Sequence, residues 1–80
     1  MKQEEPQVLQ VLLFRKDEVS PIVVMESTNF AECKKVWKDL IAKWTKAHKE
    51  AEPFILENPI VTAFEPGIVA EIKIFPKIEP

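Results

Sequence analysis

The segment from residue 31 to residue 50, AECKKVWKDLIAKWTKAHKE, constrains the fold more than any other, because it carries a long amphipathic helix pattern. Its apolar residues recur at three- and four-residue spacing, which places them on one side of a helix. These residues are Cys33, Val36, Trp37, Leu40, Ile41, Trp44 and Ala47. Asn29 and Glu32 match a capping box at the start, with Thr28 as a competing cap. Pro53 stops the pattern, so the sequence predicts one helix that packs an apolar stripe against a sheet.

Strands are expected on both sides of this helix, where short runs are rich in β-branched and large apolar residues. Residues 7–15 and 22–26 precede the helix, and residues 60–64 and 68–75 follow it. The last run alternates, with Ile68, Ala70, Ile72 and Ile74 on one face and Glu71 and Lys73 on the other. The predicted order of elements is therefore ββαββ.

The order of the strands in the sheet follows from chain direction and proline. A helix laid across the sheet reverses the chain, so the second and third strands should run in the same direction, as should the first and fourth. Pro59 cannot donate a ladder hydrogen bond, which favours an edge position for the third strand. The first strand is apolar at almost every residue, which favours a central position.

These arguments predict a single α+β domain over residues 1–80, with residues 1–6 and 76–80 as frayed tails. The fold class is ββαββ, a four-stranded mixed sheet in the order 2-1-4-3 with one helix packed on one face. This arrangement is β-grasp-like. A sheet in the order 1-2-3-4, or another ββαββ sheet, is the alternative.

The last two predicted strands should form a hairpin. The sequence EPGI at residues 65–68 has proline and glycine at the central positions of a type II turn. The apolar pairs across this hairpin are then Ala63 with Ala70 and Val61 with Ile72. Because all four side chains are apolar and share one face, the pattern supports this register.

The chain has one glycine and one cysteine, which limits the kinds of binding and catalytic site that it can form. No glycine-rich phosphate loop and no internal disulfide can form. Cys33 and His48 would lie about 22 Å apart on one helix, which is too far for a nucleophile–base pair. Zinc needs more Cys or His ligands than these two. We therefore expect no catalytic residues, metal, cofactor or small-molecule ligand, and a protein that is not an enzyme.

The N-terminal sequence MKQEEP shows no secretory signal, and the longest apolar run, VLLF, is far shorter than the roughly 20 residues that cross a bilayer. We therefore expect a cytoplasmic protein with no membrane contact.

The predicted helix carries six lysines, although the chain has a formal net charge of −2. Three of them, Lys35, Lys43 and Lys46, lie four residues from an acid. The other three, Lys34, Lys38 and Lys49, share a flank without acids. Three unpaired lysines are few for nucleic-acid binding, so this flank is expected to provide at most a weak electrostatic contact. A nucleic-acid accessory protein that uses it is the alternative function.

The sheet face away from the helix is the more informative surface, because it carries large apolar residues with no second helix to cover them. The predicted interface consists of Val8, Leu12, Phe14, Ile60, Phe64, Val69 and Phe75. Sizeable contiguous apolar patches are uncommon on monomers, although the two tails could cover part of this one. The sequence thus predicts a small non-catalytic protein-interaction module or assembly subunit, whose partner is another protein or a second copy in a homodimer.

Overall fold

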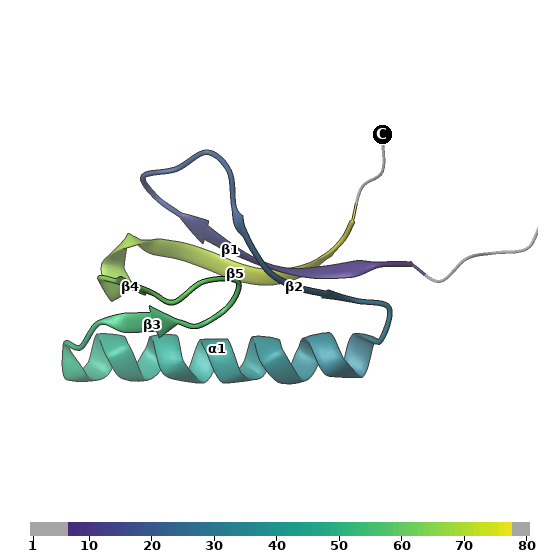
Figure 1. Cartoon of the computed structure of the whole chain (residues 1–80). Coiled ribbons are helices and arrows are strands. Elements are labelled where there is room, and N and C mark those ends of the chain that lie inside the picture. Colours follow the sequence, from purple (N-terminus) through teal and green to yellow (C-terminus); the bar gives the residue numbers. More distant parts are fainter. Residues whose placement is uncertain (1–6, 78–80) are drawn as a thin grey trace, which may run out of the picture.

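In the computed structural model, which describes residues 7–77, one long helix lies along β-structure (Figure 1). The elements are β1 (Leu9–Arg15), β2 (Ile22–Ser27), α1 (Phe30–Glu50), β3 (Phe54–Leu56), β4 (Thr62–Phe64), the 3-10 helix η1 (Pro66–Ile68) and β5 (Val69–Pro76). The predicted α+β class, with one helix packed on a sheet, is confirmed.

The predicted four-stranded mixed sheet is wrong. The strands form a three-stranded antiparallel sheet in the order β2-β1-β5 and a separate two-stranded hairpin of β3 and β4. The reason is one unpredicted strand. The chain between Pro53 and Glu65 folds into two short strands joined by residues 57–61, where the Asn58–Pro59 peptide bond is cis. This extra reversal makes β5 antiparallel to β1, so the parallel central pair of a β-grasp sheet does not form.

The predicted register of the last hairpin is also wrong. Ala63 pairs with Ile55 across the β3–β4 hairpin, and Ile72 pairs with Leu13 of β1. Gly67 lacks the positive φ that a type II turn requires at that position, and it lies in η1. The segment before β5 is therefore a short helical turn that passes the chain from one sheet to the other.

Two β-bulges change which residues face α1. In β2, Met25 pairs with Val11 and Val23 pairs with Leu12, so Val24 is the additional residue. A second bulge lies in β5, where the register shifts between Phe14 and Arg15 of β1 and leaves Ala70 unpaired. Beyond this bulge the strict alternation predicted for β5 fails: Val69 turns into the core, where 2% of its surface is exposed, and Ala70 is exposed.

The helix begins and ends close to the predicted positions. Asn29 is the N-cap, and its side-chain oxygen accepts a hydrogen bond of 3.2 Å from the Glu32 backbone N–H. At the other end Ala51 adopts a left-handed conformation, and its N–H donates to the Ala47 carbonyl. The helix therefore ends at Glu50, three residues before Pro53.

The core lies between α1 and both β-layers. Figure 1 shows the β3–β4 hairpin over the C-terminal half of α1 and β2 approaching its N-terminal half. The buried core residues are Val11, Leu13, Val24, Cys33, Leu40, Ala47, Phe54, Leu56, Val69 and Ile72. The hairpin thus contributes two residues of its own to a core that the sheet and helix share.

Trp37 and Trp44 are half-buried against this core, and each indole N–H has a backbone partner. Trp37 donates to the Ile72 carbonyl at 2.8 Å, and Trp44 donates to the Pro66 carbonyl at 2.9 Å. The two side chains therefore fasten α1 to β5 and to η1 by packing and by hydrogen bonds.

The Trp37 hydrogen bond also satisfies a backbone carbonyl on the outer edge of β5. The Lys77 N–H donates to the Val8 carbonyl, which marks a hydrogen-bonded pair beside β1. Because such pairs alternate along an antiparallel ladder, Ile72 and Leu13 form a non-hydrogen-bonded pair. The Ile72 carbonyl therefore faces the edge of β5 that has no strand partner in the described chain, and Trp37 satisfies it.

Candidate contact surfaces

The two groups with nucleophile or base chemistry lie at opposite ends of α1. Cys33 is fully buried near the helix start, and its thiol lies 4.0 Å from the carbonyl oxygens of Leu9 and Ser27. Burial raises the pKa of this thiol, and the charge of Glu32 adds to the effect, so the reactive thiolate form is disfavoured. His48 is exposed near the helix end, with its ring 5.8 Å from that of Trp44.

Residues 7–77 contain no group of three His, Cys, Asp or Glu side chains placed to hold a metal ion. Within the same range, no helix is both long enough and apolar enough to span a bilayer. The described chain presents three surfaces of distinct character: the open sheet face, the lysine side of α1, and the outside of the β3–β4 hairpin.

The open face of the three-stranded sheet is interrupted by a charge. The Lys73 ammonium lies 5.2 Å from the centre of the Phe14 ring and 5.3 Å from that of the Phe75 ring. Its charge is favourable over both rings, and Glu71 lies 3.7 Å away from it. Leu12 pairs with Lys73 across the strands and is only 7% exposed. The centre of this face is therefore closed by a cation between two phenyl rings.

Three of the seven predicted interface residues lie away from this face. Val69 is a core residue because the β5 bulge turns it inward, so its predicted place on the open face is wrong. Phe64 packs against the core, with the Arg15 guanidinium 5.6 Å from its ring centre. Ile60 lies in the β3–β4 loop and is exposed there. The open face retains Val8, Leu12, Phe14 and Phe75.

A polar cluster lies on the same face at the start of β1. The Gln10 amide donates to one oxygen of Glu26 at 2.9 Å, and the Lys77 ammonium lies 3.5 Å from the other oxygen. The Gln10 hydrogen bond is the main cause that lowers the pKa of the Glu26 carboxyl; desolvation opposes it, and Lys77 lowers the pKa further. These three residues link β1, β2 and the end of β5 across the sheet.

This cluster predicts a pH dependence of stability. The pKa of Glu26 is lower in the folded chain than in the unfolded chain. The ionised carboxylate therefore contributes fully to the free energy of unfolding at pH values above its pKa in the unfolded chain. That contribution is lost as the pH falls through the folded value. We expect Gln10→Ala to raise the Glu26 pKa toward that of an ordinary carboxyl, measured by carboxyl-detected NMR titration. A Glu26 pKa that is the same in both proteins would contradict this assignment.

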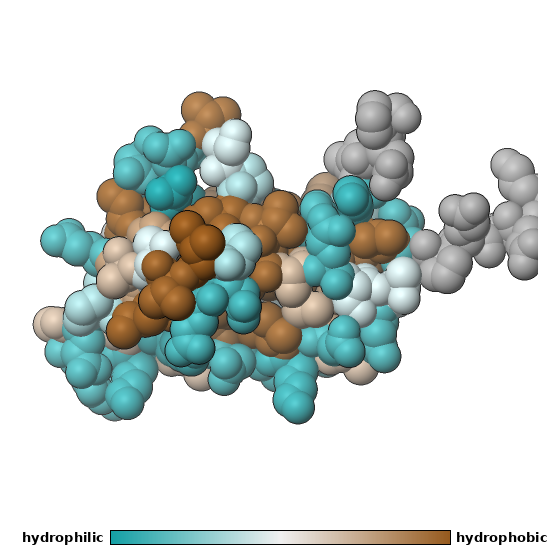
Figure 2. Space-filling model, viewed as in Figure 1, coloured by the Kyte–Doolittle hydropathy of each residue, from teal (hydrophilic) through white to brown (hydrophobic). Residues whose placement is uncertain are grey.

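The β3–β4 hairpin and its loop carry three exposed large apolar residues within seven positions of the chain. Ile55 is 49% exposed, Ile60 is 68% exposed and Val61 is 77% exposed, and we call these three residues the hairpin patch. Phe54 and Leu56, on either side of Ile55, point the other way and are buried. Figure 2 shows hydrophobic side chains gathered over this hairpin, with hydrophilic side chains of α1 below them.

Sequence reasoning missed this surface because it assigned residues 60–64 to a strand inside the main sheet. A signal was present in the sequence. The dipeptide Asn58-Pro59 separates the apolar runs at 54–56 and 60–64, and such a dipeptide favours a turn. Two short strands around that turn would have placed Ile55 and Ile60 on a hairpin rather than in the sheet.

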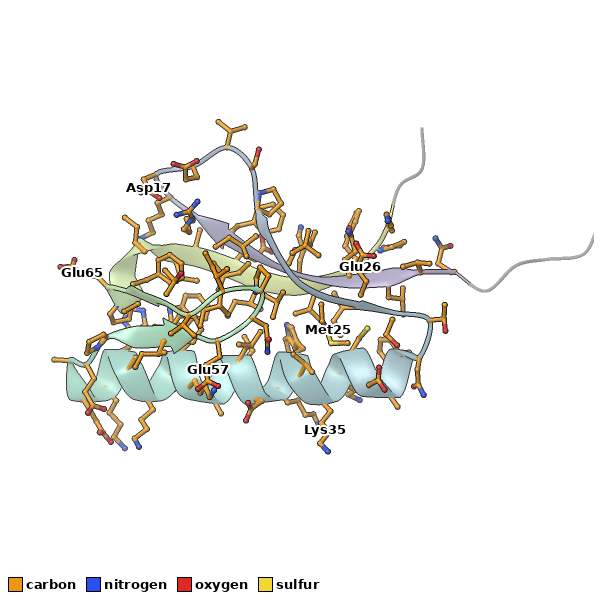
Figure 3. All side chains as sticks on the ribbon, viewed as in Figure 1. Asp17, Met25, Glu26, Lys35, Glu57 and Glu65 are labelled. Carbon is orange, nitrogen blue, oxygen red and sulfur yellow. The ribbon has the colours of Figure 1, made fainter. Side chains whose placement is uncertain are left out.

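A groove of about 790 Å³ separates the hairpin from α1. Lys35, Val36, Asp39 and Lys43 are among its residues from α1, Ile55 and Glu57 are among those from the hairpin, and Val24 contributes from β2. Figure 3 shows Glu57 extending from the hairpin toward α1, with Lys35 farther along the helix toward its start. The groove thus has an apolar lining and charged residues on both sides.

Charge is divided unequally between the two sides of this groove. Of the residues that line it, the hairpin side has one acid, Glu57, and no basic residue, whereas the α1 side has three lysines, Lys35, Lys38 and Lys43, and two acids, Glu32 and Asp39. Only Lys43 of these lysines has an ion pair among the described residues, with Asp39 at 3.9 Å. The expected pairing of Lys35 with Asp39 and of Lys46 with Glu50 is not seen.

The predicted lysine flank is exposed along its whole length. Lys34, Lys38 and Lys49 all face solvent, and none forms an ion pair within residues 7–77. Lys38 lines the groove, whereas Lys34 and Lys49 lie outside its lining. The basic surface of α1 therefore reaches the groove.

No protein-family model, curated protein or solved structure matches this chain. The fold and its surfaces define a small α+β domain. What this domain offers for function is the shape, apolarity and charge of its own surface.

Proposed function

We propose that this protein is a small protein-interaction module or assembly subunit that acts by binding another protein chain. The observation that carries the proposal is the hairpin patch, in which three large apolar side chains lie exposed on one hairpin. Burying apolar surface contributes about 25 cal/mol per Å², so a chain that covers this patch gains a substantial driving force. Exposed apolar clusters of this kind are typical of contact sites.

The hairpin patch is a better contact site than the open sheet face. On the sheet face Lys73 lies between the two phenyl rings, and a partner would have to displace or accommodate that charge. The hairpin patch has no charged residue among its three members. A nucleic-acid role through the α1 lysines is less favoured, because the net charge of −2 opposes approach to phosphate.

The proposal predicts that polar substitutions in the hairpin patch abolish partner binding. The bait would be the tagged chain with Ile60→Asp and Val61→Asp, compared with the wild-type bait in a lysate of the source organism that also contains the untagged chain. We expect a protein retained by the wild type, or the untagged chain itself, to be lost. Both residues are exposed, so the fold should persist, as circular dichroism would check.

The matched control is Phe75→Asp, which places the same charge on the open sheet face, where Phe75 is also exposed. Retention of the partner by this control locates the contact on the hairpin. If the double variant captures the same proteins as the wild type, or if no protein is captured specifically by the wild type, the proposal is wrong.

A further inference from the structure

We propose that the partner of the hairpin patch is a second copy of this chain, bound about a two-fold axis that passes over the groove. This inference rests on the proposed function and names the partner. It combines the shape of the groove with the unequal charge on its two sides.

The arrangement of the two surfaces suits a two-fold contact. In such a contact the same surface is used by both copies, and each element meets the element across the axis. Ile55 of the hairpin patch lines one side of the groove, and Lys35 and Lys38 of α1 line the other. Ile60 and Val61 lie on the same hairpin, outside that lining. A two-fold rotation about that groove therefore places the hairpin of each copy on α1 of the other, and Ile60 and Val61 enter the apolar lining that Val36 and Ile55 provide.

Charge complementarity selects the second copy over a partner of other chemistry. A chain that covers this surface should bring a basic group to Glu57 on the hairpin side and acidic groups to Lys35 and Lys38 on the helix side. The protein itself carries both on one surface: Glu57 on the hairpin side, and Lys35 and Lys38 on the helix side. None of these three forms an ion pair within residues 7–77. In the two-fold contact Glu57 faces the lysines of the other copy, and each pairing occurs twice.

The test is a concentration series by analytical ultracentrifugation at low salt and at physiological ionic strength. We expect a reversible dimer that is weaker at higher salt, because exposed charges are screened. Glu57→Lys alone, or Lys35→Glu with Lys38→Glu, should each raise the dimer Kd by about tenfold, since each exposed pair is lost twice. Combining all three substitutions should restore the dimer, because the charges then exchange sides.

Lys49→Glu is the matched control, because it makes the same change of charge on α1 at a residue outside the groove lining. It should leave the dimer Kd near the wild-type value. Ile60→Asp should give a folded monomer, because Ile60 is exposed in the single chain.

Three results would overturn the inference. A wild-type protein that is monomeric at every concentration overturns it. The proposed function is then tested independently by the capture experiment. A dimer that resists Ile60→Asp but dissociates with Phe75→Asp places the contact on the sheet face. If Ile60→Asp abolishes the dimer but the substitutions at Glu57, Lys35 and Lys38 leave its Kd unchanged, the hairpin of one copy does not pair with the helix of the other.

Discussion

Replacing Trp37 by alanine is expected to destabilise the domain by about 3 kcal/mol, which is a large part of the total stability of so small a domain. The indole packs half-buried against the core, and its N–H satisfies the Ile72 carbonyl at the edge of β5. The substitution removes both the packing and this hydrogen bond. Urea denaturation followed by circular dichroism measures the loss.

Trp37→Phe is the control that keeps an aromatic ring at this position. It removes the N–H donor and the five-membered part of the indole, so we expect a loss of about 1–2 kcal/mol in the free energy of unfolding, smaller than that of Trp37→Ala. If Trp37→Ala costs no more than this control, the indole ring does not pack between α1 and β5 as described.

Phe54→Ala should lower the free energy of unfolding by about 3–5 kcal/mol. Phe54 is 1% exposed and is one of the largest side chains of the core. The neighbouring substitution Ile55→Ala removes an apolar side chain of similar chemistry from the outer face of the same strand. It should cost less than about 1 kcal/mol, since Ile55 is half exposed. Chemical denaturation of the two variants side by side provides the measurement.

This pair of variants tests whether the β3–β4 hairpin is docked on the core. Equal costs for the two substitutions would mean that β3 does not bury one face and expose the other. The hairpin patch would then lose its basis, because Ile55 would be as much a core residue as Phe54.

The helix could be predicted from the sequence because every local signal agreed. The cap at Asn29, the apolar stripe and the stop before Pro53 all point to one element, and the structure has that element. The first two strands were also predictable, because β1 and β2 consist of short runs with strong strand propensity next to each other in the chain.

The sheet topology and register could not be predicted, because they depend on three features with weak local signals: one short strand and two bulges. The run at residues 54–56 is too short for a confident strand, yet its pairing with β4 reverses the direction of β5. The bulges at Val24 and Ala70 are single additional residues, and their positions depend on the partner strand rather than on local sequence. Because Val69 directly precedes the additional residue Ala70, its predicted place on the open face was wrong for the same reason.

The contact surfaces were predictable only in part. The residues Val8, Leu12, Phe14 and Phe75 share a face, as alternation implied, but the position of Lys73 over the rings depends on side-chain geometry. Ile60 was singled out in a sheet and lies on the hairpin. Its exposure follows from the β3–β4 pairing and could not be derived before that pairing was known.

The central position of β1 has a consequence for the order of folding. Leu9 pairs with Pro76, so the strand at the start of the described chain is completed by the strand at its end. Loop closure over so long a separation must precede that pairing, which slows folding relative to a helical domain of similar size. During synthesis, β1, β2 and α1 leave the ribosome before β5 does. The nascent chain therefore exposes one edge of β1 and the part of α1 that β5 covers until β5 has emerged, and the domain completes its sheet only then.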